Sequence, residues 1–565
     1  MIDFTLEIPL NADFKSMDGL FKKRPLFAME MNNENQECRF WGDPIPNGDL
    51  SRFDCSKWDA GMIAQGMRGH FYYIIWNRRD CLVTVGNSLF SILPVYYRIG
   101  ADRIMLAATA LDVATHAGQI ELSRRFVLET TLFNYPLFNG SVVTGVSLLP
   151  SNSFLRVSKG KCVISRHTSV ADHFQADPLP WRKALSEMSE TFLKSVGHYF
   201  PNKHYYTTLT GGFDGRTLTA AGLYHNKSIS CYSFGSQSSA DITIAADLAA
   251  LAKIPFLRLE LDDAFVKEIS LDCGLEFIRG SSGSATFARS HYLHAARKLG
   301  KKTEHIVTGN FGSEILRAAH VPGEMISPNL LRLFNSRIAG DGIKLIETSS
   351  EFSYLNRSAF KNSWDELQED LRNLPCFSTE YQPLTRNEQF YVFVFEEVFR
   401  KYFGAEMVNQ FRYVKNRTPF LDWKFLKAIL RTELAGVHSG FFESNPAKRF
   451  KGQVLYGQII RDAFPVLGRM KTDKGYRPDD LLSLTGKLHI AWGYFNRVIR
   501  GRGRVNADPF AVRRAFNENR EAYKKIRIDP DWFNTQKIRQ ELGGVPTETL
   551  FNPLSLSYMK ELVES

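Results

Sequence analysis

Cysteine is scarce in this sequence, and none of it is paired. The 565 residues include seven cysteines, none in a CxxC pair, so neither a zinc ribbon nor a thioredoxin-like redox site is indicated. Such a scattered, odd set is typical of reduced core thiols in the cytoplasm. The start, with Asp3 and Glu7 ahead of any apolar run, lacks the features of a signal peptide. No apolar run approaches about 18 residues, the length that crosses a bilayer. We therefore expect a soluble cytoplasmic protein with no membrane contact.

Positive charge, by contrast, is in excess. The chain has 71 Lys and Arg against 60 Asp and Glu, a formal net charge of +11, which indicates an affinity for anions. The charges are spread along the chain, and the densest cluster consists of Arg497, Arg500, Arg502 and Arg504. We interpret this cluster as a solvated helix and loop rather than an RNA-binding arm, so we expect no nucleic-acid partner.

Two different hydrophobic patterns divide the chain. Residues 1–170 carry short alternating runs such as FYYIIW (71–76), typical of hairpin-built sheets. Residues 171–181, with two prolines, predict a linker. Beyond it, predicted strands alternate with helices, and from about residue 385 the pattern is mainly helical. The strands are expected at 205–210, 228–235, 256–261 and 305–309. The sequence therefore predicts an α/β protein with an α+β N-terminal domain and a doubly wound parallel sheet.

The segment LTGGFDGRT (209–217) has the composition of an anion-binding loop between the first of these strands and a helix. Gly211 and Gly212 let the backbone turn sharply, and its N–H groups together with the helix N-terminus form an anion site. Thr210 adds a hydroxyl, and the Asp214 carboxylate is suited to a magnesium ion between phosphates. The alternative is a Gly-Gly turn with Asp214 as the helix N-cap.

Two further strand ends lead into small polar loops, SFGSQSSAD (233–241) and TGNFGSE (308–314). Ligands bind at the carboxyl ends of the strands in open parallel sheets. Three such loops therefore favour a ligand site over simple turns.

The order of these motifs resembles the asparagine synthetase family. Residues 210–215 are similar to the family's pyrophosphatase loop, S-G-G-x-D-S, and 233–235, followed by Asp241, resemble its S-F-G landmark. Residues 309–314 resemble G-E-G-x-D-E, 417–422 match R-x-P-F-L-D, and 464–476 resemble L-P…R-x-K-x-G-F. The resemblance implies an ATP pyrophosphatase domain over residues 181–480, followed by a helical C-terminal extension over 481–565.

The N-terminal part resembles the family's glutamine amidotransferase domain. Residues 69–71, 94–97 and 143–146 follow its motif order, which implies an N-terminal nucleophile-hydrolase-like β-sandwich over residues 1–175. The family nucleophile is a cysteine at position 2, exposed by methionine removal. This chain has Ile2 there, and its first cysteine is Cys38. An aliphatic side chain cannot attack an amide, so we expect no glutamine hydrolysis.

The resemblance implies a ligase that activates a carboxylate with ATP and magnesium, releases pyrophosphate, and couples the acyl group to ammonia or an amine. It assigns Lys474 as catalytic, with Lys471 as a nearby rival because the spacing is imperfect, and Asp214 and Glu314 as metal ligands. The resemblance also leaves a homodimer open. It assigns ATP binding to Thr208, Leu209, Thr210, Gly211, Gly212, Asp214, Gly215, Ser233, Thr308 and Gly309.

Three positions depart from the family pattern: Ser313 replaces the motif aspartate, Asn310 the glutamate, and Gly215 the last serine of the loop. We expect Glu314 to supply the missing carboxylate, although neighbouring helical residues point about 100° apart. The alternative is a non-catalytic binding or scaffold protein that keeps the fold. The retained loop and Lys474 favour the ligase, whereas Ser313 and Asn310 favour the alternative.

Overall fold

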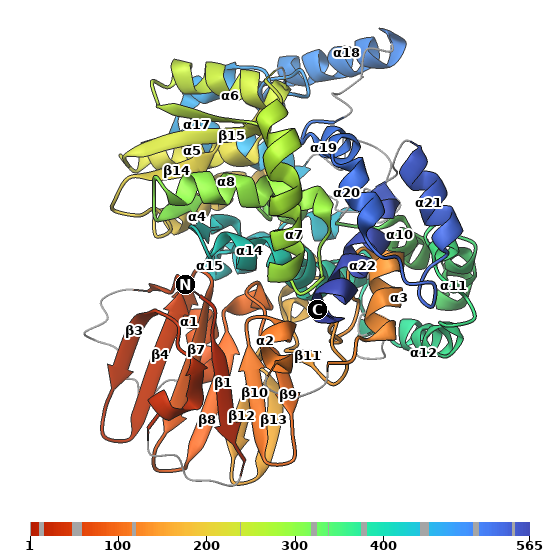
Figure 1. Cartoon of the computed structure of the whole chain (residues 1–565). Coiled ribbons are helices and arrows are strands. Elements are labelled where there is room, and N and C mark those ends of the chain that lie inside the picture. Colours follow the sequence, from red (N-terminus) through yellow and green to blue (C-terminus); the bar gives the residue numbers. More distant parts are fainter. Residues whose placement is uncertain are drawn as a thin grey trace.

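A computed structural model describes most of the chain (Figure 1). The described residues are 2–10, 16–47, 59–115, 120–237, 239–317, 325–336, 338–374, 381–440, 451–500, 508–544 and 548–564, with only the backbone for 494–500. The predicted arginine cluster at 497–504 therefore lies outside the described side chains. Among the described helices, none combines the length and the apolar character needed to cross a membrane.

The N-terminal part is built from two antiparallel sheets, at the bottom of Figure 1. One sheet has the order β11 (Ser147–Leu148), β9 (Tyr96–Ile99), β10 (Arg103–Ala107), β1 (Thr5–Pro9), β2 (Phe21–Lys23). The other has the order β13 (Lys161–Arg166), β12 (Ser153–Ser158), β8 (Leu82–Asn87), β7 (Phe71–Asn77), β4 (Gln36–Gly42), β3 (Phe27–Asn32). A short ladder joins β5 (Ile45–Pro46) and β6 (Met67–Arg68). The predicted β-rich character of this part is confirmed.

Strand β7 packs against buried side chains on both of its faces. Because side chains alternate between the two faces of a strand, Phe71, Tyr73 and Ile75 pack into one buried cluster. Tyr72 and Ile74 pack into the large core on the other face. Both faces of this strand are therefore covered, which accounts for its nearly continuous apolar sequence.

The later part contains a five-stranded parallel sheet with the order β16 (Phe256–Glu260), β15 (Ile229–Gly235), β14 (Tyr205–Thr208), β17 (His305–Val307), β18 (Lys415–Arg417). The four predicted strands and their parallel pairing are confirmed. Strand β18 was missed, because it is three residues long and lies in a stretch predicted as mainly helical. The strand order reverses at β14, so the loops after β14 and β17 leave the sheet on either side of a crevice.

Helices surround the parallel sheet and fill the C-terminal part, and short helices also lie beside the antiparallel sheets (Figure 1). They are α1 (Ala60–Gly66), α2 (Ala110–Ala114), α3 (Arg124–Phe133), α4 (Trp181–Val196), α5 (Asp214–Tyr224), α6 (Ala240–Leu251), α7 (Ser270–Gly280), α8 (Ser290–Gly300), α9 (Gly312–Leu316), α10 (Pro328–Asn335), α11 (Ala339–Glu347), α12 (Lys361–Arg372), α13 (Arg386–Phe393), α14 (Gly404–Gln410), α15 (Trp423–Ile429), α17 (Lys451–Ala463), α18 (Leu484–Arg500), α19 (Val512–Glu518), α20 (Arg520–Lys525), α21 (Thr535–Gly543) and α22 (Phe551–Glu564). A π-helix, Val394–Phe403, joins α13 to α14.

The start of the predicted linker is not a plain connection. Val170–His173 forms a turn of 3₁₀-helix, with a capping box between Ser169 and Asp172. The carboxylate of Glu396 accepts hydrogen bonds from the Ser169 hydroxyl at 3.1 Å and the Val170 N–H at 2.9 Å. The turn is therefore tied to the π-helix far along the chain, a contact that the local sequence does not indicate.

A buried ion pair joins the antiparallel part to the parallel sheet. Arg417, at the end of β18, donates to both carboxylate oxygens of Asp43, at 2.6 and 3.0 Å. His305 Nε2 lies 3.4 Å from the same carboxylate. Burial by itself raises the pKa of the Asp43 carboxyl, but the hydrogen bonds and charges of His305 and Arg417 hold it well below its usual range. The motif at 417–422 thus begins with a contact between the two parts.

We predict that Arg417→Met destabilises the protein by about 3–5 kcal/mol, because it leaves the Asp43 carboxylate buried without its partner. Chemical denaturation would measure the loss. The matched control is Arg103→Met, which breaks an exposed pair with Asp102 and should change stability little. Equal effects of the two substitutions would contradict the role given to Arg417.

Candidate functional site

A cavity of about 280 Å³ lies at the carboxyl ends of β14, β15 and β17. Of the residues predicted to bind ATP or metal, Leu209, Gly211 and Gly212 are not in its lining, although they belong to the same loop. Leu209 is instead fully buried in the core. The predicted residues that do line the cavity are Thr208, Thr210, Asp214, Gly215, Ser233, Thr308, Gly309 and Glu314.

The loop after β14 presents its backbone N–H groups to oxygen atoms. The N–H of Gly211 donates to Asp241 at 3.3 Å, and that of Gly212 donates to the hydroxyl of Thr210 at 3.2 Å. A phosphate oxygen bound here would take the place of these acceptors. The neighbouring β17 loop is joined to β14 by a hydrogen bond from the Gly309 N–H to the Thr208 hydroxyl, at 3.3 Å.

Two glycines allow these loops to pack around the start of α5. A Cβ atom on Gly215 would lie 2.3 Å from the carbonyl oxygen of Thr208, and one on Gly309 would lie 2.5 Å from the Cβ of Asp214. Real side chains do not tolerate such distances. The departure at Gly215 therefore has a local cause, because a serine there would collide with the end of β14.

The carboxylate of Asp214 is the meeting point of three segments. Ser313 donates to one of its oxygens at 2.7 Å, and the hydroxyl of Tyr456, on α17, donates to the other. The N-cap of α5 is Phe213, without a side-chain cap bond, so the alternative interpretation of Asp214 as the N-cap is wrong. The replacement of the motif aspartate by Ser313 exchanges a second negative charge for a hydrogen-bond donor.

Glu314 lies close enough to Asp214 to be affected by its charge. Burial and the Asp214 carboxylate raise the pKa of Glu314 to about 7. Burial disfavours the charge of Arg317, but Asp214, Tyr456 and Glu314 raise its pKa overall. Within the described ranges no group of three metal-ligating side chains occurs. A magnesium ion held by Asp214 and Glu314 would thus take its remaining oxygen ligands from phosphates and water.

The side chain of Asn310 contacts Glu406 and not Asp214. Its side-chain amide donates to Glu406 at 3.3 Å, and Glu406 forms a buried ion pair with Arg289 at 2.9 Å. The next residue, Phe311, has φ of 71°, a left-handed conformation that is rare for a bulky side chain. Its ring packs 4.5 Å from that of Phe403, so aromatic packing accompanies this unusual backbone.

Hydrogen bonds join the segment with both candidate lysines to the loop at 209–213. The N–H of Asp473 donates to the carbonyl of Gly211 at 3.0 Å. Arg216, fully buried on α5, donates to the carbonyls of Leu467, Met470 and Lys471, at 3.2, 2.7 and 3.2 Å. Because these bonds use backbone oxygens, they set the path of the segment whatever its side chains are.

The two lysines differ in their surroundings. Lys474 is partly buried, with its ammonium 5.4 Å from the ring centre of Phe213. Burial and the charge of Arg317 lower the pKa of Lys474, whereas Asp473 and Asp214 act in the opposite direction. Lys471 is exposed. Lys474 is thus the lysine whose charge is felt at Asp214.

The opposite wall of the cavity is largely apolar. Tyr232, Ala295, Ala296, Leu299 and Ile306 line it and belong to one buried cluster. Ser233 also lines the cavity, and its buried hydroxyl has no hydrogen-bond partner among the described residues. An unpaired hydroxyl beside an apolar wall is suited to a ligand with a flat ring and polar substituents.

Several residues of the site were not found by sequence reasoning. Tyr456 and Arg317 belong to no motif, and Phe510 comes from the C-terminal region to which no motif was assigned. Asp241 was noted only as part of a landmark. Only its acidic side chain at the N-terminus of a helix could have suggested a loop contact.

Comparison of the chain with protein-family models and with curated proteins finds no match. Its function is therefore inferred from the chemistry of this cavity. The arrangement combines backbone N–H groups, two carboxylates and an apolar wall, with the cationic side chains of Lys474 and Arg317 near Asp214.

We predict that Glu314 makes stability fall with rising pH. Its pKa of about 7 in the folded chain lies above its value of about 4.3 when unfolded. The protonated form therefore stabilises the fold fully below about pH 4, and this contribution is lost as pH rises toward 7 and above. Relative to Glu314→Gln, the wild type should lose about 2–3 kcal/mol between pH 4 and 8, measured by denaturation at each pH. Glu268→Gln, at an exposed position, is the control. Parallel curves for wild type and Glu314→Gln would refute the prediction.

Proposed function

We propose that this chain is an ATP-dependent ligase. It activates a carboxylate as an acyl-adenylate with release of pyrophosphate, and it couples the acyl group to ammonia or an amine. The observation that carries the proposal is the convergence of three strand-end loops, with their hydroxyls, glycines and carboxylates, on one cavity where the strand order reverses. The resemblance of these loops to the asparagine synthetase motifs supports the same chemistry.

The residues of the cavity fit a nucleoside triphosphate with magnesium. The apolar wall formed by Tyr232 and Leu299 matches a purine ring, and Ser233 offers its unpaired hydroxyl beside it. The 209–213 loop offers N–H groups to phosphates. Asp214 and Glu314 supply carboxylate oxygens, the ligands that magnesium prefers. When bound, magnesium neutralises phosphate charge and makes pyrophosphate a better leaving group.

Activation by ATP is needed because a carboxylate is a poor electrophile until its oxygen can leave. In the proposed reaction Lys474 directs its ammonium at the oxyanion that develops as the amine attacks. A positioned cation in a water-poor site contributes roughly 3–4 kcal/mol to such a step. Arg317 adds a second positive charge near Asp214. The bonds from Arg216 to the 467–471 backbone hold the lysine segment in position.

The amine partner is proposed to come from solution. Ile2 is buried in the core of the N-terminal part and has no thiol, so glutamine is not a nitrogen source by the family route. Free ammonia or an amine substrate remains. The N-terminal part then serves to support the second part through contacts such as Arg417–Asp43.

One observation favours a second candidate, a non-catalytic nucleotide-binding or scaffold protein. Both carboxylate oxygens of Asp214 accept hydrogen bonds from Ser313 and Tyr456, and a metal ion would compete with these donors. In the second candidate the fold persists without turnover. Pyrophosphate exchange separates the two, because only a ligase incorporates labelled pyrophosphate into ATP.

We predict carboxylate-dependent ATP–pyrophosphate exchange in the wild type, assayed across a panel of carboxylic acids with magnesium. Asp214→Ala should reduce the exchange rate at least about 100-fold, since it removes a carboxylate from the phosphate site. Asp247→Ala, on the exposed face of α6, is the matched control and should keep the wild-type rate. No exchange with any acid, together with ATP binding by calorimetry, would favour the non-catalytic candidate.

We further predict that Lys474→Met lowers the rate of product formation about 10²- to 10³-fold while ATP binding is retained. Lys471→Met makes the same chemical change at the exposed neighbour and should have little effect. The two half-reactions are measured separately, by pyrophosphate exchange and by amide formation. Full activity in Lys474→Met, with loss in Lys471→Met, would transfer the role to Lys471.

A further inference from the structure

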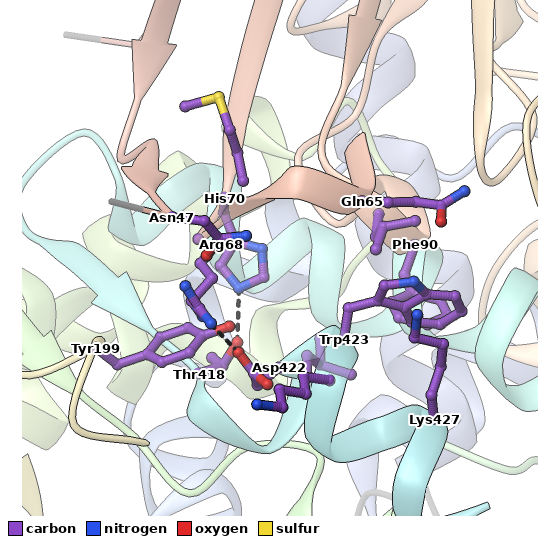
Figure 2. Close-up of a pocket in the computed structure, with 15 residues that line it drawn as sticks. Asn47, Gln65, Arg68, His70, Phe90, Tyr199, Thr418, Asp422, Trp423 and Lys427 are labelled. Carbon is purple, nitrogen blue, oxygen red and sulfur yellow. Dashed lines mark hydrogen bonds and ion pairs between the residues drawn. The ribbon is translucent and has the colours of Figure 1, made fainter. Parts of the chain in front are cut away.

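A second cavity, of about 120 Å³, lies at the junction of the antiparallel part and the segment that follows β18. Figure 2 shows that Arg68, His70 and Phe90 reach it from the N-terminal part, whereas Thr418, Asp422, Trp423 and Lys427 reach it from the other side. It shares no described lining residue with the cavity at the ends of β14, β15 and β17, which we call the nucleotide cavity after the function proposed for it.

Two hydrogen bonds hold its walls together, drawn as dashed lines in Figure 2. His70 Nε2 lies 2.7 Å from the hydroxyl of Thr418, and Arg68 Nε donates to Asp422 at 2.7 Å. Thr418 and Asp422 both belong to the motif at 417–422. The cavity is therefore formed by two parts of the chain about 350 residues apart in sequence and exists only when those parts are docked.

Three nitrogen atoms of the lining residues are buried without a hydrogen-bond partner among the described residues. They are Nη1 of Arg68, Nδ1 of His70 and Nε1 of Trp423. Arginine and indole nitrogens can only donate. Because unpaired buried donors are costly, the partner that Arg68 and Trp423 lack is a group rich in acceptor atoms.

The charges around the cavity also favour an acceptor-rich, negatively charged ligand. Lys424 and Lys427 line it, and the ammonium of Lys427 lies 5.5 Å from the ring centre of Trp423. Among the described residues of the lining, Asp422 is the one acidic side chain. It is already paired with Arg68 and also caps α15 by accepting from the Phe425 N–H at 3.0 Å. The lining thus has an excess of positive charge and of donors.

We propose that this junction cavity binds a compact oxyanion, a small carboxylate or a phosphate, on Arg68, Trp423 and Lys427. Ordered water is the simplest alternative, since about 10–15 Å³ of such space holds one molecule. Water would pair the donors but would leave the lysine charges uncompensated. The inference does not depend on the ligase proposal, because it concerns other residues.

The site adjoins the nucleotide cavity through the backbone. The N–H of Thr308, which lines the nucleotide cavity, donates to the carbonyl of Arg417 at 3.0 Å, and Arg417 immediately precedes Thr418. An anion in the junction cavity would stabilise the docking of the two parts. It should therefore raise the thermal midpoint of the chain, by an amount that grows with the logarithm of the anion concentration above its Kd.

The test is calorimetric titration of the intact chain at low ionic strength with succinate and, separately, with inorganic phosphate. One equivalent of succinate or phosphate should bind to the wild type. Trp423→Phe, which removes only the indole donor, should weaken binding about tenfold, and Lys427→Met about three- to fivefold. Lys344→Met, at an exposed position on α11, should bind as the wild type does. A preference between the two probes identifies the oxyanion as a carboxylate or a phosphate.

Asp214→Ala separates this site from the nucleotide cavity. Succinate affinity in Asp214→Ala should equal that of the wild type, and its loss would assign the anion to the nucleotide cavity instead. Absence of binding by both probes at millimolar concentration would overturn the proposal. So would equal affinities in wild type, Trp423→Phe and Lys427→Met. Lys427→Met keeps the test decisive if Trp423→Phe does not fold, because Lys427 is only partly buried, whereas Trp423 is buried in the core.

Discussion

The Asp214 carboxylate is the point on which the arrangement of the site depends. It begins α5 and accepts hydrogen bonds from Ser313, after β17, and from Tyr456, on α17. The position is possible only because Gly309 and Gly215 have no side chains, so that the β17 loop, the end of β14 and the first turn of α5 meet at van der Waals distance. A single carboxylate thereby fixes the relative positions of three segments. A metal ion bound to Asp214 would compete with the hydrogen bonds from Ser313 and Tyr456.

The end of β18 has a comparable role between the two parts of the chain. Arg417 binds Asp43, Thr418 contacts His70, and Asp422 accepts from Arg68. Because β18 pairs in parallel with β17, whose loop lines the nucleotide cavity, the docked N-terminal part bears directly on the wall of that cavity. Through these contacts the N-terminal part supports the sheet that carries the cavity.

The departures from the asparagine synthetase pattern have separate local explanations. Gly215 avoids a collision with the Thr208 carbonyl, Ser313 donates to Asp214, and Asn310 donates to the buried Glu406. At position 215 a bulkier side chain is replaced by none. At 313 and 310 a carboxylate is replaced by a group that donates a hydrogen bond to a neighbouring carboxylate. That Glu314 compensates for the carboxylate absent at Ser313 stays a prediction. Burial and the Asp214 carboxylate raise the pKa of Glu314 to about 7.

The sequence by itself determined the alternation of strands and helices, the antiparallel character of the first part and the loops that line the nucleotide cavity. These follow from local periodicity and from glycine, which act over a few residues. Strand β18 escaped detection because three residues carry too little periodicity. Only the tertiary structure brought Tyr456, Arg317 and Phe510 to the site, and only it formed the junction cavity. The reason is that these contacts join residues far apart in sequence, 242 positions for Tyr456 and Asp214, and no local pattern encodes which distant side chains the packed core will bring together.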